Sequence, residues 1–76
     1  MDPKEIEQLI QQGMSPTQVS VSGAEGKYTA EVVSNAFEGL STLKRHKLVY
    51  ACVNEQITSG ALHALTIVAK TEAEVA

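Results

Sequence analysis

The stretch Ser59–Thr71, SGALHALTIVAKT, places one histidine, His63, at the start of a run of apolar, β-favouring residues. A side chain at a strand end is half packed and half hydrated, so its imidazole is suited to two roles, as an edge residue of the core or as a metal ligand. A closed metal site needs about four ligands, and His63 and the single cysteine, Cys52, cannot supply them. If His63 binds a metal, the other ligands must come from outside the chain.

A basic cluster, LKRHK, opens the longest predicted helix and carries Lys44, Arg45, His46 and Lys47. Cations in the first turn of a helix oppose its macrodipole, at a cost of up to ~1 kcal/mol each. Because these cations do not stabilise the helix, their placement suggests that they have another role. Two interpretations stay open: a solvated face with His46 at the edge of the core, or a docking patch for an anion, a partner protein or nucleic acid.

Enzymatic activity is not expected from these residue types. Nucleophilic catalysis requires a nucleophile, a base and an orienting group within reach of one another, and Cys52 lies on the predicted buried stripe of a helix, where a thiol is usually inert. The acidic residues are scattered along the chain, and no phosphate-binding motif is present. The sequence GAEG (Gly23–Gly26) matches the nucleotide clamp of KH domains, but it lies in a predicted hairpin and contains an acid, so we interpret it as a turn.

Length and charge limit the remaining classes. With 76 residues, the chain is predicted to be one domain, residues 1–76, and its net charge of −3 leaves any nucleic-acid contact to the local basic cluster. A lone cysteine excludes an internal disulfide. Because no signal-peptide pattern and no run long enough to span a bilayer is present, we expect a cytoplasmic protein without membrane contact. The sequence is compatible with a homodimer.

The first half of the chain predicts a helix followed by a hairpin. Residues 1–13 have a capping box, Asp2 with Glu5, an apolar stripe, and Gly13 as the expected end of the helix. Two runs with alternating apolar residues follow, on either side of the Gly23–Gly26 turn, and we expect them to pair as antiparallel strands. The second run carries Tyr28, Ala30 and Val32 on one face.

The second half predicts a long helix and a third strand. Phe37 is expected to anchor the connection in the core, and Ser41 to cap a helix that continues to Gly60. Helical spacing predicts a buried stripe, which Leu48 widens. The stripe comprises Val49, Cys52, Val53 and Ile57. In the strand that follows, His63, Leu65, Ile67 and Ala69 share one face. Residues 71–76 are expected to form a loosely held tail.

The predicted order is helix, strand, strand, helix, strand. A helical crossover favours parallel pairing of the second and third strands. We therefore expect an α+β sandwich of two layers, with helices on one face of a three-stranded mixed sheet.

Two segments, FEGLSTLKRHKLVY (Phe37–Tyr50) and LHALTIVAKT (Leu62–Thr71), resemble the BolA family, most closely its short bacterial branch of the IbaG/YrbA type. The similarity extends over essentially the whole chain. It implies a fold like that of class II KH domains, in agreement with the element order above. It also implies a monothiol glutaredoxin of the CGFS type as partner, with a bridging [2Fe–2S] cluster held by the glutaredoxin cysteine, a glutathione thiol and the histidine that matches His63.

The loop between the first two strands departs from the family pattern. Cluster-binding members often carry a second histidine or cysteine ligand there, whereas residues 22–28 contain neither, and Lys27 stands about where that ligand would fall. An ammonium group has no lone pair for iron. The resemblance leaves open a cluster with one ligand from this chain, a labile cluster, or a functional apo complex.

Two hypotheses follow. The leading one is a non-enzymatic adaptor that shares a [2Fe–2S] cluster through His63 and acts in iron–sulfur trafficking or in iron, redox and stress regulation, with Lys44, Arg45, His46 and Lys47 shaping the docking surface. The alternative, also implied by the family, is a KH-like transcriptional regulator that uses this basic helix. Because the chain is acidic as a whole, we expect its DNA binding to be weak and salt-sensitive.

Overall fold

Helix α1 (Pro3–Met14) begins the computed structural model, which describes all residues from 1 to 76. The predicted capping box is confirmed: the Asp2 carboxylate accepts from the Lys4 N–H (2.8 Å), and the Glu5 carboxylate accepts from the Asp2 N–H (3.2 Å). The predicted end at Gly13 is wrong. The helix continues to Met14, and Ser15 caps it in the left-handed conformation (φ 45°).

The hairpin is confirmed. Strand β1 (Gln18–Ala24) pairs antiparallel with β2 (Lys27–Val33). The turn consists of Glu25 and Gly26, with φ values of 56° and 80°. Two successive positive φ values are typical of the type I′ turns that match the twist of a hairpin.

The long helix predicted from Ser41 to Gly60 is wrong as a single element. Ser41 does cap α2 (Thr42–Cys52), but Val53 interrupts the helix (φ −123°, ψ 17°), and a short helix α3 (Asn54–Thr58) follows. The Val53 N–H donates to Tyr50 O (3.1 Å), which tightens the last turn, and the Val53 side chain is fully buried. The break in the helix at Val53 turns the chain toward the next strand, and the Val53 side chain is buried at this bend.

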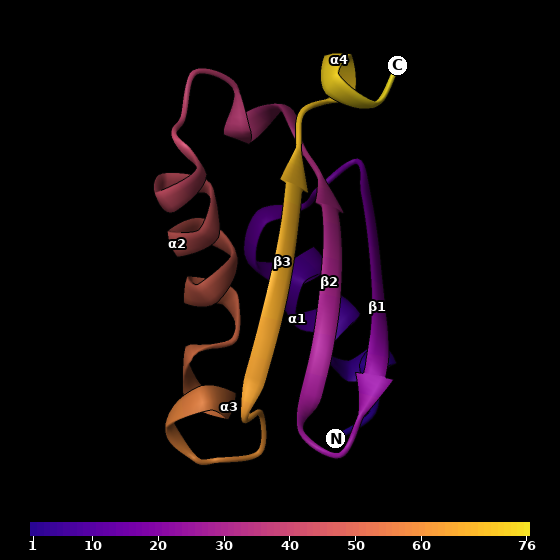
Figure 1. Cartoon of the computed structure of the whole chain (residues 1–76), viewed down its shortest axis with the longest axis vertical. Helices are drawn as coiled ribbons and strands as arrows, with labels where there is room; N and C mark the ends of the chain where they lie inside the picture. Colours follow the sequence, from indigo (N-terminus) through magenta and orange to yellow (C-terminus); the bar gives the residue numbers. More distant parts are fainter.

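Strand β3 (Ala64–Lys70) completes the sheet in the order β1-β2-β3, parallel to β2. Figure 1 shows α1 behind the sheet and α2 alongside β3, and both helices pack against the common core. The predicted α+β sandwich with a three-stranded mixed sheet is therefore confirmed.

The core lies between the sheet and the two helices. Tyr28, Ala30, Val32 and Phe37 are buried, as predicted. The predicted stripe on the long helix is correct for Val49 and Val53. The prediction is wrong for Leu48 and Ile57, which are 40% and 37% exposed. Ile57 lies beyond the end of α2, in the separate helix α3. The buried apolar residues are Ile6, Ile10, Val21, Tyr28, Ala30, Val32, Phe37, Val49, Val53, Leu62, Leu65 and Ile67.

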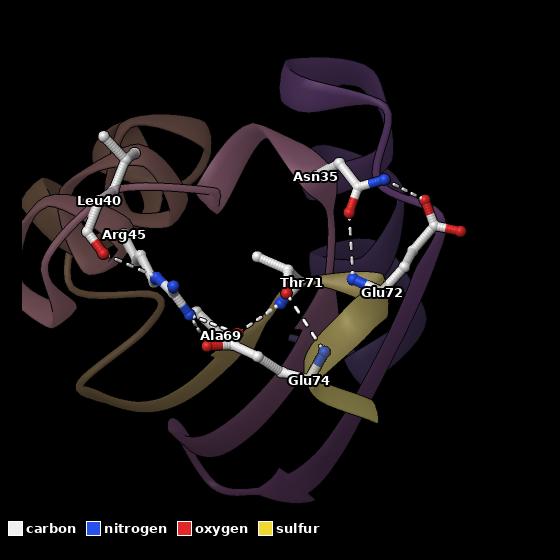
Figure 2. Close-up of polar contacts among 7 residues, drawn as sticks. All are labelled: Asn35, Leu40, Arg45, Ala69, Thr71, Glu72 and Glu74. Carbon is white, nitrogen blue, oxygen red and sulfur yellow. Dashed lines mark hydrogen bonds and ion pairs between the residues drawn. The ribbon is translucent and has the colours of Figure 1, made fainter. Parts of the chain in front are cut away.

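Residues 71–76, expected to form a loose tail, have more contacts than the sequence suggested. They contain helix α4 (Glu72–Val75), in which Thr71 and Glu74 form a second capping box. The Asn35 side chain, in the short helix η1 (Asn35–Phe37), donates to the Glu72 carboxylate (2.5 Å) and accepts from the Glu72 N–H (3.1 Å). Figure 2 shows these contacts, which attach α4 to the chain that follows β2.

Side chains from the helices contact the outer edges of the sheet. The Glu7 carboxylate accepts from the Val21 N–H of β1 (3.1 Å), and the Tyr50 hydroxyl donates to Leu65 O of β3 (3.2 Å). Such contacts occupy edge groups that could otherwise pair with another chain. No helix has the length and apolar character needed to cross a bilayer.

Candidate functional site

His63 lies one residue before β3, at the end of the sheet that carries the β1–β2 turn. By the alternation of side chains along a strand, His63 falls on the same face as the buried Leu65 and Ile67. Its side chain is nevertheless exposed, because this position lies beyond the end of the core. The structure therefore corrects the expectation of a half-buried strand residue.

The backbone around His63 is held from both sides. Gly26 O accepts from the His63 N–H (2.8 Å) and from the Ala64 N–H (2.9 Å), which joins the hairpin turn to the start of β3. The preceding residue, Leu62, is buried, and its N–H donates to Gln56 O (3.0 Å). An exposed imidazole thus stands on a fixed backbone.

The imidazole packs against the bare backbone of Gly26. A Cβ built on Gly26 would lie 3.0 Å from His63 Cγ and 3.3 Å from His63 Nδ1. Sequence reasoning assigned Gly26 to a turn only. Its place in the predicted Gly23–Gly26 turn is a signal for positive φ, but nothing local indicates that His63, far along the chain, lies against it.

The hairpin turn places Lys27 at the same end of the sheet as this histidine. Lys27 is the first residue of β2 and is the register partner of Ala64, the residue after His63. Its neighbour Tyr28 is buried, and the Tyr28 hydroxyl donates to the Met1 carbonyl oxygen, which attaches the N-terminus at this end of the sheet. No three His, Cys, Asp or Glu side chains gather into a group that could hold a metal ion, and the β1–β2 turn next to His63 contains neither histidine nor cysteine.

The basic cluster does not act as one patch. Lys44 and Lys47 are exposed and make no ion pair, whereas His46 is half-buried. Arg45 is directed into the fold, where its Nε donates to Leu40 O (3.0 Å).

The Arg45 guanidinium connects α2 with the end of β3 and with α4, as Figure 2 shows. Its Nη1 donates to Ala69 O (3.2 Å) and to Glu74 Oε1 (2.7 Å). The hydrogen bond from Arg45, and then the one from the Thr71 N–H, lower the pKa of Glu74 to about 2. Arg45 is thus committed to a structural contact.

His63 and the basic cluster lie near opposite ends of β3. Arg45 contacts Ala69, and the six residue steps from position 63 to position 69 span about 20 Å at the usual rise per residue. The structure does not bring the two sets of predicted site residues together.

Cys52 is half-buried in the helix layer. Its thiol donates to Leu48 O (3.4 Å), and burial raises the pKa of the thiol, which keeps it protonated at neutral pH. A protonated thiol packed between helices is a poor nucleophile and a poor metal ligand.

Comparison with known proteins gives a consistent result. The family of BolA-like proteins matches residues 5–74. An uncharacterised protein of the rpoN–murA intergenic region of Acinetobacter guillouiae is 36% identical, over 97% of this chain and 89% of that protein. The acid stress protein IbaG of Escherichia coli is 33% identical, over 97% of this chain and 88% of IbaG.

Solved structures have the same fold. A BolA homologue from Coxiella burnetii superposes with a TM-score of 0.88 and 33% identity, over 99% of this chain and 96% of that one. The BolA domain of SufE1 from Arabidopsis thaliana superposes with a TM-score of 0.84 and 34% identity, over 95% of this chain and 93% of that one.

Proposed function

Because the chain belongs to the BolA-like family, we propose that it is a non-enzymatic adaptor for a monothiol, CGFS-type glutaredoxin. In this proposal His63 contributes one ligand to a [2Fe–2S] cluster that the glutaredoxin cysteine and a glutathione thiol also hold. The observation that carries the proposal is the placement of His63: an exposed imidazole on a backbone fixed at three consecutive residues. It belongs to no group of three side chains that could hold a metal ion within this chain.

The donor set fits a shared cluster better than a site within this chain. Imidazole nitrogen ligates iron in some [2Fe–2S] centres, in place of thiolate. Cys52 does not add a thiolate, because its thiol is protonated and packed in the helix layer. One accessible nitrogen donor is what an adaptor needs when a partner brings the thiolates.

Lys27 contributes charge to the same end of the sheet. Its ammonium cannot coordinate iron, so the proposal assigns one ligand to this chain. A cluster with thiolate ligands carries net negative charge. The exposed ammonium of Lys27 attracts such a cluster, and water and salt screen this attraction. Lys27 therefore favours docking of an anionic cluster without binding the metal.

The names of relatives supply context for this role. A BolA domain occurs in SufE1 of Arabidopsis thaliana, and IbaG of Escherichia coli is named for acid stress. We extend to this chain a role in iron–sulfur trafficking or in redox and stress regulation, in the cytoplasm.

The test is to mix the purified chain, without oxygen, with a cluster-loaded CGFS glutaredoxin and glutathione, and to record visible absorption and circular dichroism. We expect a changed spectrum and a one-to-one complex. His63→Ala should abolish the spectral change, whereas His46→Ala, which removes the other histidine, should retain it. An unchanged spectrum without association, or a changed spectrum that survives His63→Ala, would contradict the proposal.

A second candidate function, weak DNA binding, rests on the exposure of Lys44 and Lys47 near the start of α2. Arg45 is bound within the fold, so two lysines remain, and so few phosphate contacts give a low affinity, which salt weakens further. Replacing both lysines with glutamate should abolish such binding and leave the cluster spectrum unchanged. Sedimentation of the chain alone, at the same concentrations, shows whether a homodimer forms.

A further inference from the structure

We infer that Gly26 is a positioning residue for His63, and that the hairpin turn holds the imidazole so that Nε2 is the nitrogen that faces a metal. The first half of this inference concerns the chain alone. The second half rests on the proposed function, because it names the donor atom of the same site.

The contact between the turn and the ring leaves little room for a side chain at position 26. A Cβ there would lie 3.0 Å from His63 Cγ, 3.3 Å from Nδ1 and 3.4 Å from His63 Cβ. Separations of 3.0–3.4 Å are tighter than nine in ten real Cβ contacts, so an alanine would shift the imidazole or the turn by a few tenths of an ångström. The exposed ring thus packs against the backbone of Gly26.

The same residue also holds the histidine backbone. Gly26 O accepts from the N–H groups of His63 and Ala64, at 2.8 and 2.9 Å. The turn and the start of β3 cannot separate without loss of both hydrogen bonds. Gly26 therefore sets the position of the His63 backbone and limits the orientation of its ring.

Positive φ alone does not explain this glycine. Gly39 and Gly60 have φ values of 76° and 83°, close to the 80° of Gly26, but a Cβ at either would have no neighbour within 4 Å. All three positions disfavour an L side chain to a similar degree, and only Gly26 combines that requirement with contact to an imidazole. Gly60 is thus a matched control for backbone strain.

The orientation of the ring selects between its two nitrogens. Nδ1 is among the three atoms nearest the position of the absent Cβ, so this edge of the imidazole lies against the turn. Nε2 lies across the ring from Cγ and points away from that contact. A metal at Nε2 approaches from open solvent, whereas a metal at Nδ1 would approach from the side of the turn.

Nuclear magnetic resonance of the free chain tests the positioning role. In Gly26→Ala, the imidazole resonances of His63 should shift while those of His46 stay unchanged, and in Gly60→Ala both histidines should keep their wild-type resonances. Equal shifts in the two variants, or none in Gly26→Ala, would overturn the inference. If Gly26→Ala fails to fold, nuclear Overhauser effects from Gly26 Hα to the side-chain protons of His63 in the wild-type chain decide the matter, and their absence overturns it.

Pulsed electron paramagnetic resonance of the complex with the glutaredoxin, after reduction of the cluster, tests the donor atom. The chain is prepared with histidine labelled with 15N at Nε2 only or at Nδ1 only. A strong hyperfine coupling from Nε2 supports the assignment, and one from Nδ1 overturns it. If neither label couples and His63→Ala leaves the cluster spectrum unchanged, the proposed function fails, whereas the positioning role, read from the free chain, is unaffected.

Discussion

Gly13 and Cys52 lie against each other where α1 packs on α2: a Cβ on Gly13 would stand 2.6 Å from Cys52 Sγ and 3.1 Å from Cys52 Cβ. A glycine inside a helix costs about 1 kcal/mol relative to alanine. Here the missing side chain makes room for the thiol, which accounts for a glycine inside α1 rather than after its end. Packing of the helix layer overrides the usual meaning of glycine at a helix end.

We therefore predict that Gly13→Ala destabilises the chain, although alanine is the better helix former. Overpacking of a close contact costs about 1–3 kcal/mol, which exceeds the gain in helix propensity. In a Cys52→Ala background the sulfur is gone and the penalty should shrink or reverse. Urea unfolding of the two single variants and the double variant gives the coupling free energy, which should be at least about 1 kcal/mol. Additive effects would mean that Gly13 and Cys52 do not share this contact in solution.

The Arg45 guanidinium leads to a second prediction. Arg45→Ala removes the donor to Leu40 O, the donor to Ala69 O and one of the two donors to the Glu74 carboxylate, which should lower the free energy of unfolding by about 1–3 kcal/mol. Lys44→Ala, an exposed neighbour without such contacts, should change it by less than about 0.5 kcal/mol. Denaturant unfolding measures both. Amide exchange at Thr71 and Glu74 should quicken in the Arg45 variant only, and equal effects of the two substitutions would contradict the structural role.

The lowered pKa of Glu74 predicts how this contact responds to acid. The pKa is about 2 in the folded chain, below the 4.5 of a free glutamate, so the stabilisation is complete above about pH 5 and is lost as the pH falls toward 2. Glu74→Gln should remove this dependence. The stability difference between the two chains should be constant near neutrality and shrink between pH 4.5 and 2. Glu38→Gln, at an exposed carboxylate without a hydrogen-bond partner, is the control, and a parallel loss there would refute the assignment.

Much of the fold could be predicted from local signals. The capping box at Asp2 and Glu5 and the pairing of the two alternating runs as a hairpin each depend on neighbours in sequence, and each is confirmed. The predicted Gly23–Gly26 turn is too long, because β1 continues to Ala24 and leaves two residues in the turn. The break at Val53 was missed because a buried valine at helical spacing fits an unbroken helix equally well. The apolar pattern does not reveal that the helix layer ends there.

The site depends on contacts that sequence spacing does not encode. The contact of Gly26 with His63 and the ion pair of Arg45 with Glu74 each join residues more than 25 positions apart. The imidazole of His63 indicates a possible metal ligand, and the family resemblance suggests an iron–sulfur cluster as the metal centre. Only the parallel pairing of β2 with β3 places the hairpin turn next to that histidine.

That pairing leads to the last prediction, which rests on the proposed function. Lys27 is the register partner of Ala64, so position 27 lies beside the residue that follows His63. Lys27→His would place a second imidazole there, and two ligands from one chain should hold the cluster longer than one. We expect slower cluster loss from the complex, measured as decay of the visible absorption after addition of an iron chelator.

Lys27→Gln is the matched control for this prediction, because it removes the charge without adding a ligand for iron. Without the ammonium, an anionic cluster is attracted less, so the glutamine variant should lose its cluster at the wild-type rate or faster, and its rate should depend less on salt. Equal decay in the histidine and glutamine variants would show that position 27 does not reach the metal. A histidine variant that keeps the cluster even after His63→Ala would instead show that position 27 can replace His63 as the ligand from this chain.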